Sequence, residues 1–124
     1  MALVEELIDR AVVACPNETA ALVVWTDQYS IIDPPISSAG IGHVTYDNHS
    51  FSEATLVLDW HTHGMGTAVF SGTDDVSDRE RIGPHLSAVF GRCGKRGGIE
   101  VAARACLAGR FSPVSWSAIT EARA

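Results

Sequence analysis

The stretch of sequence that decides the fold is residues 55–75, TLVLDWHTHGMGTAVFSGTDD. Its first six residues are mostly apolar, which predicts a central strand that runs directly into His61. The glycines in residues 64–66 allow the chain to turn back after this strand. The polar run at residues 71–81 predicts a loop followed by a short helix. Polar side chains are therefore expected where a rigid strand ends, which is a common place for functional residues.

The rest of the chain predicts further strands and one long helix. Apolar residues recur at helical spacing over residues 2–15, and Pro16 ends this pattern. The remaining strands are predicted at residues 19–26, 31–32, 43–46, 86–92 and 99–108. These elements together predict an α+β fold with a mixed, mostly antiparallel sheet flanked by helices.

Length and composition favour a globular protein. The chain has 124 residues, of which 46% are hydrophobic and 19% charged, so we expect residues 1–124 to form one domain. Fifteen acidic residues against nine basic ones argue against sequence-independent binding to nucleic acid. The apolar runs are too short to span a membrane, and the absence of a signal-peptide pattern predicts a cytoplasmic protein. The three cysteines form no CxxC pair and are expected to be free thiols.

The residues after the central strand have the chemistry of a metal site. His61 and His63 are two positions apart on an extended strand, so their side chains point the same way. The loop that follows can bring back the carboxylate of Asp74 as a third ligand. Two histidines and one carboxylate leave one tetrahedral position open, as in catalytic zinc sites. Water in that position becomes acidic enough to act as a nucleophile near neutral pH.

The string HTH-x7-SxxD, with a glutamate upstream after the first helix, resembles the JAMM motif of the JAB/MPN family of metallopeptidases. The match is complete in residue type and spacing, and the resemblance spans most of the chain. It implies the JAB fold, which is similar to that of cytidine deaminases, and zinc held by His61, His63 and Asp74. It also implies that Ser71 helps to bind the oxyanion or to orient the water, with the glutamate as general acid and base.

Four glutamates are candidates for that general acid and base: Glu5, Glu6, Glu18 and Glu53. Glu5 and Glu6 fall on the exposed side of the first helix, and Glu53 falls in a polar turn. Glu18 opens the first core strand directly after that helix, which matches the placement that the family implies. A carboxylate beside the metal can take a proton from water and pass it to the leaving amine, so we expect Glu18 to have this role.

Other polar residues near the motif are expected to have supporting or surface roles. Asp75 is expected to stabilise the start of the short helix, and Asp59 can support a ligand histidine from the same strand face. The three histidines without ligand spacing are expected at the surface: His43, His49 and His85.

The resemblance also carries an expectation about substrate. Gly64 stands where many family members have proline, and the string is closer to a bacterial branch. That branch includes the JAB domain of the PRTRC plasmid-associated system. It also includes JAB peptidases encoded beside bacterial ubiquitin-like, E1-like and E2-like proteins, some of them in antiphage operons.

The branch implies a zinc isopeptidase or peptidase that cleaves after the C-terminal glycine of a ubiquitin-like protein. An extended substrate tail would pair with a strand edge, beside loops at residues 37–42 and 47–53. The residues by themselves support only metal-assisted hydrolysis of an amide. Two alternatives therefore stay open: a non-catalytic MPN-type scaffold, and a JAB hydrolase acting on another small peptide or a sulfur-carrier adduct.

Overall fold

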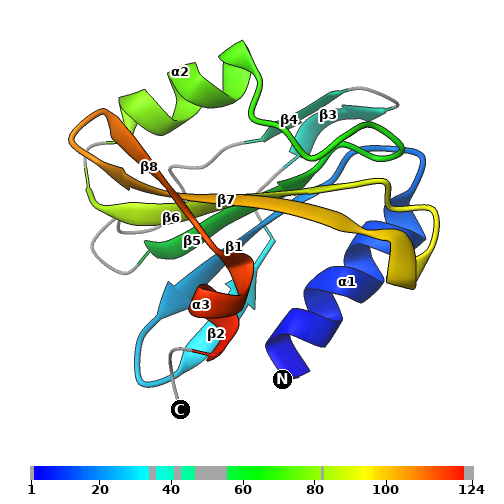
Figure 1. The fold of residues 1–124 in the computed structure, drawn as a ribbon, viewed down its shortest axis with the longest axis horizontal. Coiled ribbons are helices and arrows are strands. Elements are labelled where there is room, and N and C mark those ends of the chain that lie inside the picture. The colour runs from blue at the N-terminus through cyan, green and yellow to red at the C-terminus, as the bar shows by residue number, and fades with distance from the viewer. Residues whose placement is uncertain (1, 34–35, 41–42, 47–55, 82, 122–124) are drawn as a thin grey trace.

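The computed structural model describes residues 2–33, 36–40, 43–46, 56–81 and 83–121. Six strands form a mixed sheet in the order β2-β1-β5-β6-β7-β8 (Figure 1). Their bounds are β1 Ala20–Trp25, β2 Tyr29–Ile32, β5 Leu56–Thr62, β6 His85–Gly91, β7 Glu100–Leu107 and β8 Arg110–Val114. β5 and β6 pair in parallel, and the other neighbours in this sheet pair antiparallel.

A second, two-stranded sheet and three α-helices complete the described part of the chain. β3 (Ile36–Gly40) pairs with β4 (His43–Tyr46) in antiparallel fashion. The helices are α1 Ala2–Ala14, α2 Gly72–Glu80 and α3 Trp116–Glu121, with a short 3-10 turn, η2, at Arg96–Gly98. None of the helices in the described ranges is long and apolar enough to cross a membrane.

This architecture confirms the predicted α+β class with a mixed, mostly antiparallel sheet. The helix predicted at residues 2–15 and the predicted strands are present to within two residues at each end. Two strands were missed, β3 and β8, and both belong to hairpins whose partner strand is close in sequence. The single domain over residues 1–124 stays a prediction.

The two faces of the large sheet differ in chemistry. α1 and α3 lie on one face and α2 on the other (Figure 1). On the α1 face, alternate strand residues build the hydrophobic core, including Leu58, Trp60, Ala88 and Phe90, all at most 4% exposed. Trp60 and Phe90 meet edge to face with ring centroids 5.4 Å apart.

The α2 face of the same strands is polar although it is buried. The buried polar side chains there alternate with the core residues along β5, β6 and β7: Asp59, His61, His85, Ser87 and Arg104. This alternation follows from the two-residue period of a strand. The sheet therefore separates an apolar layer under α1 from a polar layer under α2.

Backbone hydrogen bonds fix the loop that follows β5. His63 donates its N–H to Phe90 at 2.8 Å, so the chain continues beside β6 beyond the end of β5. Gly64 and Gly66 then accept hydrogen bonds from the N–H groups of Cys93 and Arg92, each at 2.8 Å. These hydrogen bonds to the residues after β6 fix the conformation of the loop that leads from β5 to α2.

Candidate metal centre

The two histidines at the end of β5 lie side by side, as their spacing predicts. Their ring centroids are 5.1 Å apart. His61 Nε2 lies 3.0 Å from one carboxylate oxygen of Asp74, and His63 Nε2 lies 3.4 Å from the other. The three residues offer ligand atoms that all lie within 4.8 Å of one another. The structure therefore brings together the three residues that the sequence singles out as metal ligands.

The hydrogen bonding of the imidazoles fits a metal site. The Nδ1–H of His63 donates to the carbonyl of Thr67 at 3.1 Å, which leaves its Nε2 facing Asp74. His61 Nε2 is buried and has no hydrogen-bond partner, although Asp74 lies 3.0 Å away. Two imidazole nitrogens and a carboxylate at this spacing are a donor set that zinc takes. His61, His63 and Asp74 can therefore hold such an ion.

Ser71 and Asp74 are joined by a reciprocal pair of hydrogen bonds. Ser71 is the N-cap of α2, and its Oγ accepts from the N–H of Asp74 at 3.1 Å. The carboxylate of Asp74 in turn accepts from the N–H of Ser71 at 2.8 Å. SxxD is therefore also a capping box, a pattern in the sequence that marks the start of a helix. This pair fixes the direction of the carboxylate towards the histidines.

The electrostatics of the site keep Asp74 ionised. Burial acts to raise the pKa of Asp74, but the imidazoles of His61 and His63 and the N–H of Ser71 outweigh burial and hold that pKa far below its usual value. The pKa of His63 is raised, mainly because of its contact with Asp74. A carboxylate that stays charged is ready to serve as a ligand.

Glu18 lies beside this cluster, in the loop between α1 and β1. Its negative charge adds to the causes that raise the pKa of His63. The next residue, Thr19, is tied to the end of β5 in both directions. Its N–H donates to Thr62 Oγ1 at 3.0 Å, and its carbonyl accepts from the N–H of Thr62 at 2.9 Å. The segment that carries Glu18 is therefore held next to the two histidines of the candidate metal site.

The other candidate glutamates do not share this position. Glu5 and Glu6 form ion pairs from the exposed part of α1, with Arg96 and Arg10 respectively. Glu53 lies outside the described residues.

Comparison with known families agrees with this geometry. Residues 1–105 match the family of prokaryotic homologs of the JAB domain. The chain belongs to this family. The matched residues include both histidines, Asp74, Ser71 and Glu18, and they extend from α1 into β7. No curated protein matches the chain.

Gly64, directly after the second histidine, has a backbone conformation that favours glycine. Its φ is +58°, which a proline cannot adopt and other L-residues rarely adopt. A Cβ at this position would lie 2.4 Å from the carbonyl oxygen of Pro16. The loop after the second histidine therefore packs directly on the loop that leads to Glu18, and only glycine allows this approach.

Two acidic residues near the JAB motif have ion-pair partners. Asp75 lies in the first turn of α2, as predicted, and also accepts from Arg104 at 2.8 Å. Asp59 forms a buried ion pair with Arg81 at 3.2 Å, which no local sequence pattern indicates.

The prediction that His85 lies at the surface is wrong. His85 is 6% exposed and is covered by α2. It forms a second buried group with Asp78 and Cys106, whose side-chain donor atoms also lie within 4.8 Å of one another. His49 lies outside the described residues, and His43 belongs to β4.

Hydrogen bonds show that this second group is an ion-pair network. His85 Nε2 donates to one oxygen of Asp78 at 3.3 Å, and Arg104 donates to the other through Nη2 and Nε at 2.6 and 3.1 Å. Burial lowers the pKa of His85, but Asp78, Cys106 and the carbonyl of Gly83 together raise it to about 10. Two cationic side chains already neutralise Asp78, so this group is a poorer site for a metal than the first.

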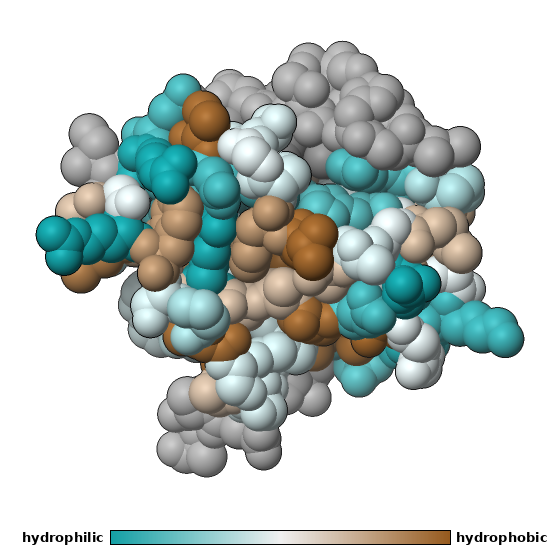
Figure 2. Space-filling view, turned by 45° about the horizontal axis from the view of Figure 1, so that its top comes forward, coloured by the Kyte–Doolittle hydropathy of each residue, from teal (hydrophilic) through white to brown (hydrophobic). Residues whose placement is uncertain are grey.

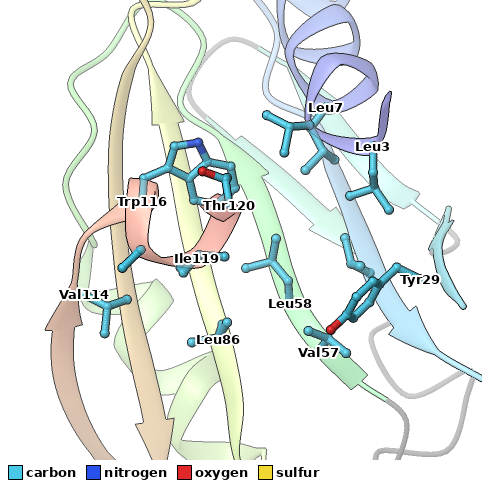
Figure 3. A pocket seen from close by; sticks show the side chains of 13 residues that line it. Leu3, Leu7, Tyr29, Val57, Leu58, Leu86, Val114, Trp116, Ile119 and Thr120 are labelled. Atoms are coloured by element: carbon cyan, nitrogen blue, oxygen red, sulfur yellow. The ribbon is translucent and has the colours of Figure 1, made fainter. Parts of the chain in front are cut away.

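An apolar pocket of about 460 Å³ lies away from these polar groups, between α1 and α3 (Figure 3). Its walls include Leu7 of α1, Leu58 of β5, and Trp116 and Ile119 of α3. These residues belong to the α1 face of the sheet, whereas the candidate metal ligands lie towards α2. The pocket and the metal centre are therefore on opposite sides of the sheet.

Proposed function

We propose that this JAB domain is a zinc-dependent isopeptidase or peptidase that cleaves after the C-terminal glycine of a ubiquitin-like protein. The observation that carries this proposal is the convergence of His61, His63 and Asp74, with Glu18 held next to them. The ubiquitin-like substrate class, and cooperation with E1-like and E2-like proteins encoded nearby, come from the resemblance to the bacterial branch of the family.

Each residue of the site has a distinct task in this proposal. His61, His63 and Asp74 hold the zinc ion, which supplies Lewis-acid chemistry for attack of water on an amide carbonyl. Glu18 takes the proton from the attacking water and delivers it to the leaving amine. The Oγ of Ser71 already accepts from the backbone N–H of Asp74, so its own O–H is left to donate to the oxyanion that develops on the carbonyl oxygen.

The surface around the site supports a protein as substrate. Three exposed apolar residues lie on the loop after the second histidine and on α2: Met65, Val69 and Val76, which are 60%, 58% and 54% exposed. Hydrophobic and hydrophilic residues are interleaved on this side of the molecule (Figure 2). Exposed apolar side chains close to the site can contribute contacts to a protein substrate, because protein interfaces combine apolar and polar groups. The predicted loop at residues 47–53 lies outside the described residues, so its part in substrate binding stays a prediction.

A cleavage assay with matched variants tests the proposal. The substrate is a ubiquitin-like protein from the same gene neighbourhood, extended after its terminal glycine and incubated with and without a chelator. We expect the chelator and Asp74→Ala to abolish both zinc binding and cleavage. Glu18→Gln should retain about one zinc per chain and lose cleavage by at least about 100-fold. Glu6→Gln, the same change on the exposed part of α1, should leave both unchanged.

Three results would contradict the proposal. Cleavage that resists the chelator would exclude the metal, and full activity in Glu18→Gln would exclude its role as acid and base. Zinc binding by the wild type without cleavage of extended or conjugated ubiquitin-like proteins would favour a scaffold or a different hydrolase substrate.

A further inference from the structure

The helix that carries Asp74 has almost no apolar face. α2 reads GTDDVSDRE, and its one apolar side chain, Val76, is 54% exposed. The buried residue of this helix is Asp78. A helix on a protein surface usually docks through a stripe of apolar residues, and α2 lacks one. Polar contacts must therefore hold this helix, and with it Asp74, on the sheet.

Arg104 on β7 supplies three of these contacts. It is 7% exposed and donates to two carboxylates of α2. Nη1 donates to Asp75 at 2.8 Å, while Nη2 and Nε donate to one oxygen of Asp78 at 2.6 and 3.1 Å. A planar guanidinium can make these bonds in several directions at once, whereas the ammonium of lysine is a single point of charge.

Two aromatic rings hold the same guanidinium. Its central carbon lies 3.8 Å from the ring centroid of Phe70 and 3.9 Å from that of Phe111. Phe70 lies in the loop before α2 and Phe111 in β8, the edge strand of the sheet, so Arg104 contacts both of these segments. Contact with two rings limits the positions that the guanidinium can take.

Two of the residues that Arg104 contacts flank the segment that carries Asp74. Phe70 directly precedes Ser71, and Asp75 directly follows Asp74. We propose that Arg104 is a positioning residue for the metal centre, which fixes both ends of the SxxD segment so that Asp74 stays against His61 and His63. The inference rests on the zinc site of the proposed function, but it does not depend on which substrate is cleaved.

A second ion pair on the same helix provides a matched comparison. Arg81, the C-cap of α2, is 2% exposed and binds Asp59 on β5 at 3.2 Å. Like Arg104 it is a buried arginine that joins α2 to the sheet. It differs in position, because it lies at the end of the helix remote from Asp74.

Zinc affinity separates positioning from general docking of the helix. Arg104→Lys and Arg81→Lys each keep the charge and lose the guanidinium. We expect Arg104→Lys to weaken zinc binding by about 10- to 100-fold, measured by competition with a chromophoric chelator. Arg81→Lys should weaken it by no more than about threefold, even where both variants lose similar stability in chelator. The absorption spectrum of bound Co²⁺, which reports ligand geometry, should change in Arg104→Lys alone.

Phe111→Leu keeps the test decisive if Arg104→Lys does not fold. This change removes one ring from the guanidinium and alters no charge, so it should weaken zinc binding in the same direction by a smaller factor. Wild-type affinity in Arg104→Lys, or in a folded Phe111→Leu when the lysine variant cannot be measured, would overturn the inference. Equal weakening in Arg81→Lys would also overturn it. Failure of the proposed function would instead be seen in the wild type, as an absence of zinc binding or as zinc binding without cleavage.

Discussion

A buried, positively charged histidine should make the stability of this protein fall as the pH rises above neutral. His85 Nδ1 lies 3.1 Å from the carbonyl oxygen of Gly83, and Nε2 lies 3.3 Å from a carboxylate oxygen of Asp78. Both partners accept hydrogen bonds, so both ring nitrogens must donate, and only the protonated imidazole has two N–H groups. This arrangement agrees with a pKa of His85 raised to about 10 against the opposing effect of burial.

The size and sign of the effect follow from that pKa. Above an unfolded pKa of about 6.5 the folded state holds a proton that the unfolded state has lost, so the free energy of unfolding falls by up to about 1.4 kcal/mol per pH unit. The contribution is complete below about pH 6.5 and disappears as the pH passes the folded value. It amounts to at most about 5 kcal/mol between a pKa of 6.5 and one of about 10. Asp78 acts in the opposite sense, because its lowered pKa contributes stability that is lost as the pH falls through its folded value.

Urea unfolding of the wild type and of His85→Gln measures this directly. Both proteins are unfolded in chelator at several pH values between about 6 and 9, and the two profiles are subtracted. Subtraction cancels the titrations that both proteins share. We expect the difference between the proteins to shrink by roughly 1 kcal/mol per pH unit above pH 7. Parallel profiles would refute the assignment of a charged His85.

Three further predictions concern the site itself. Gly64→Ala should lower the free energy of unfolding by at least about 2 kcal/mol in urea titrations, because the alanine must adopt a positive φ and its Cβ overlaps the carbonyl of Pro16. Ser71→Ala should cost about 1 kcal/mol through loss of the N-cap, and it should also weaken zinc binding in chelator competition, since the capping box orients Asp74. Excess zinc should raise the melting temperature of the wild type and leave that of Asp74→Ala unchanged, by the linkage between binding and folding.

The sequence was sufficient to predict the candidate metal ligands because their geometry is local. His61 and His63 share a face through the two-residue period of one strand, and Asp74 returns after a short turn. Glu18 is remote in sequence, and its selection depended on the resemblance to the family. The structure adds the pairing of β1 with β5, which sets Ala20 opposite His61 and so brings Glu18 near.

The polar layer could not be predicted in the same way. Along β6 and β7, polar residues such as His85 and Arg104 alternate with apolar ones, and this pattern usually indicates a strand face open to solvent. Here that face is covered by α2, whose own sequence is too polar to predict burial. The pairing of Arg104 with Asp75 and Asp78 joins residues that are 29 and 26 positions apart, so no local pattern reveals it.

The charges of this layer also explain why a cation should bind at one end of α2 and not at the other. Around Asp78, carboxylates and cationic side chains neutralise each other. Arg104 contacts both Asp75 and Asp78, and His85 adds a second positive charge, so this group holds two acids and two cations. Asp74 differs, because its ion-pair partners among the described residues include the imidazoles of His61 and His63 and no guanidinium is recorded beside it there. Imidazoles can give up their protons near neutral pH, whereas a guanidinium cannot. A divalent cation can therefore replace protons beside Asp74, while at Asp78 it would have to displace an arginine.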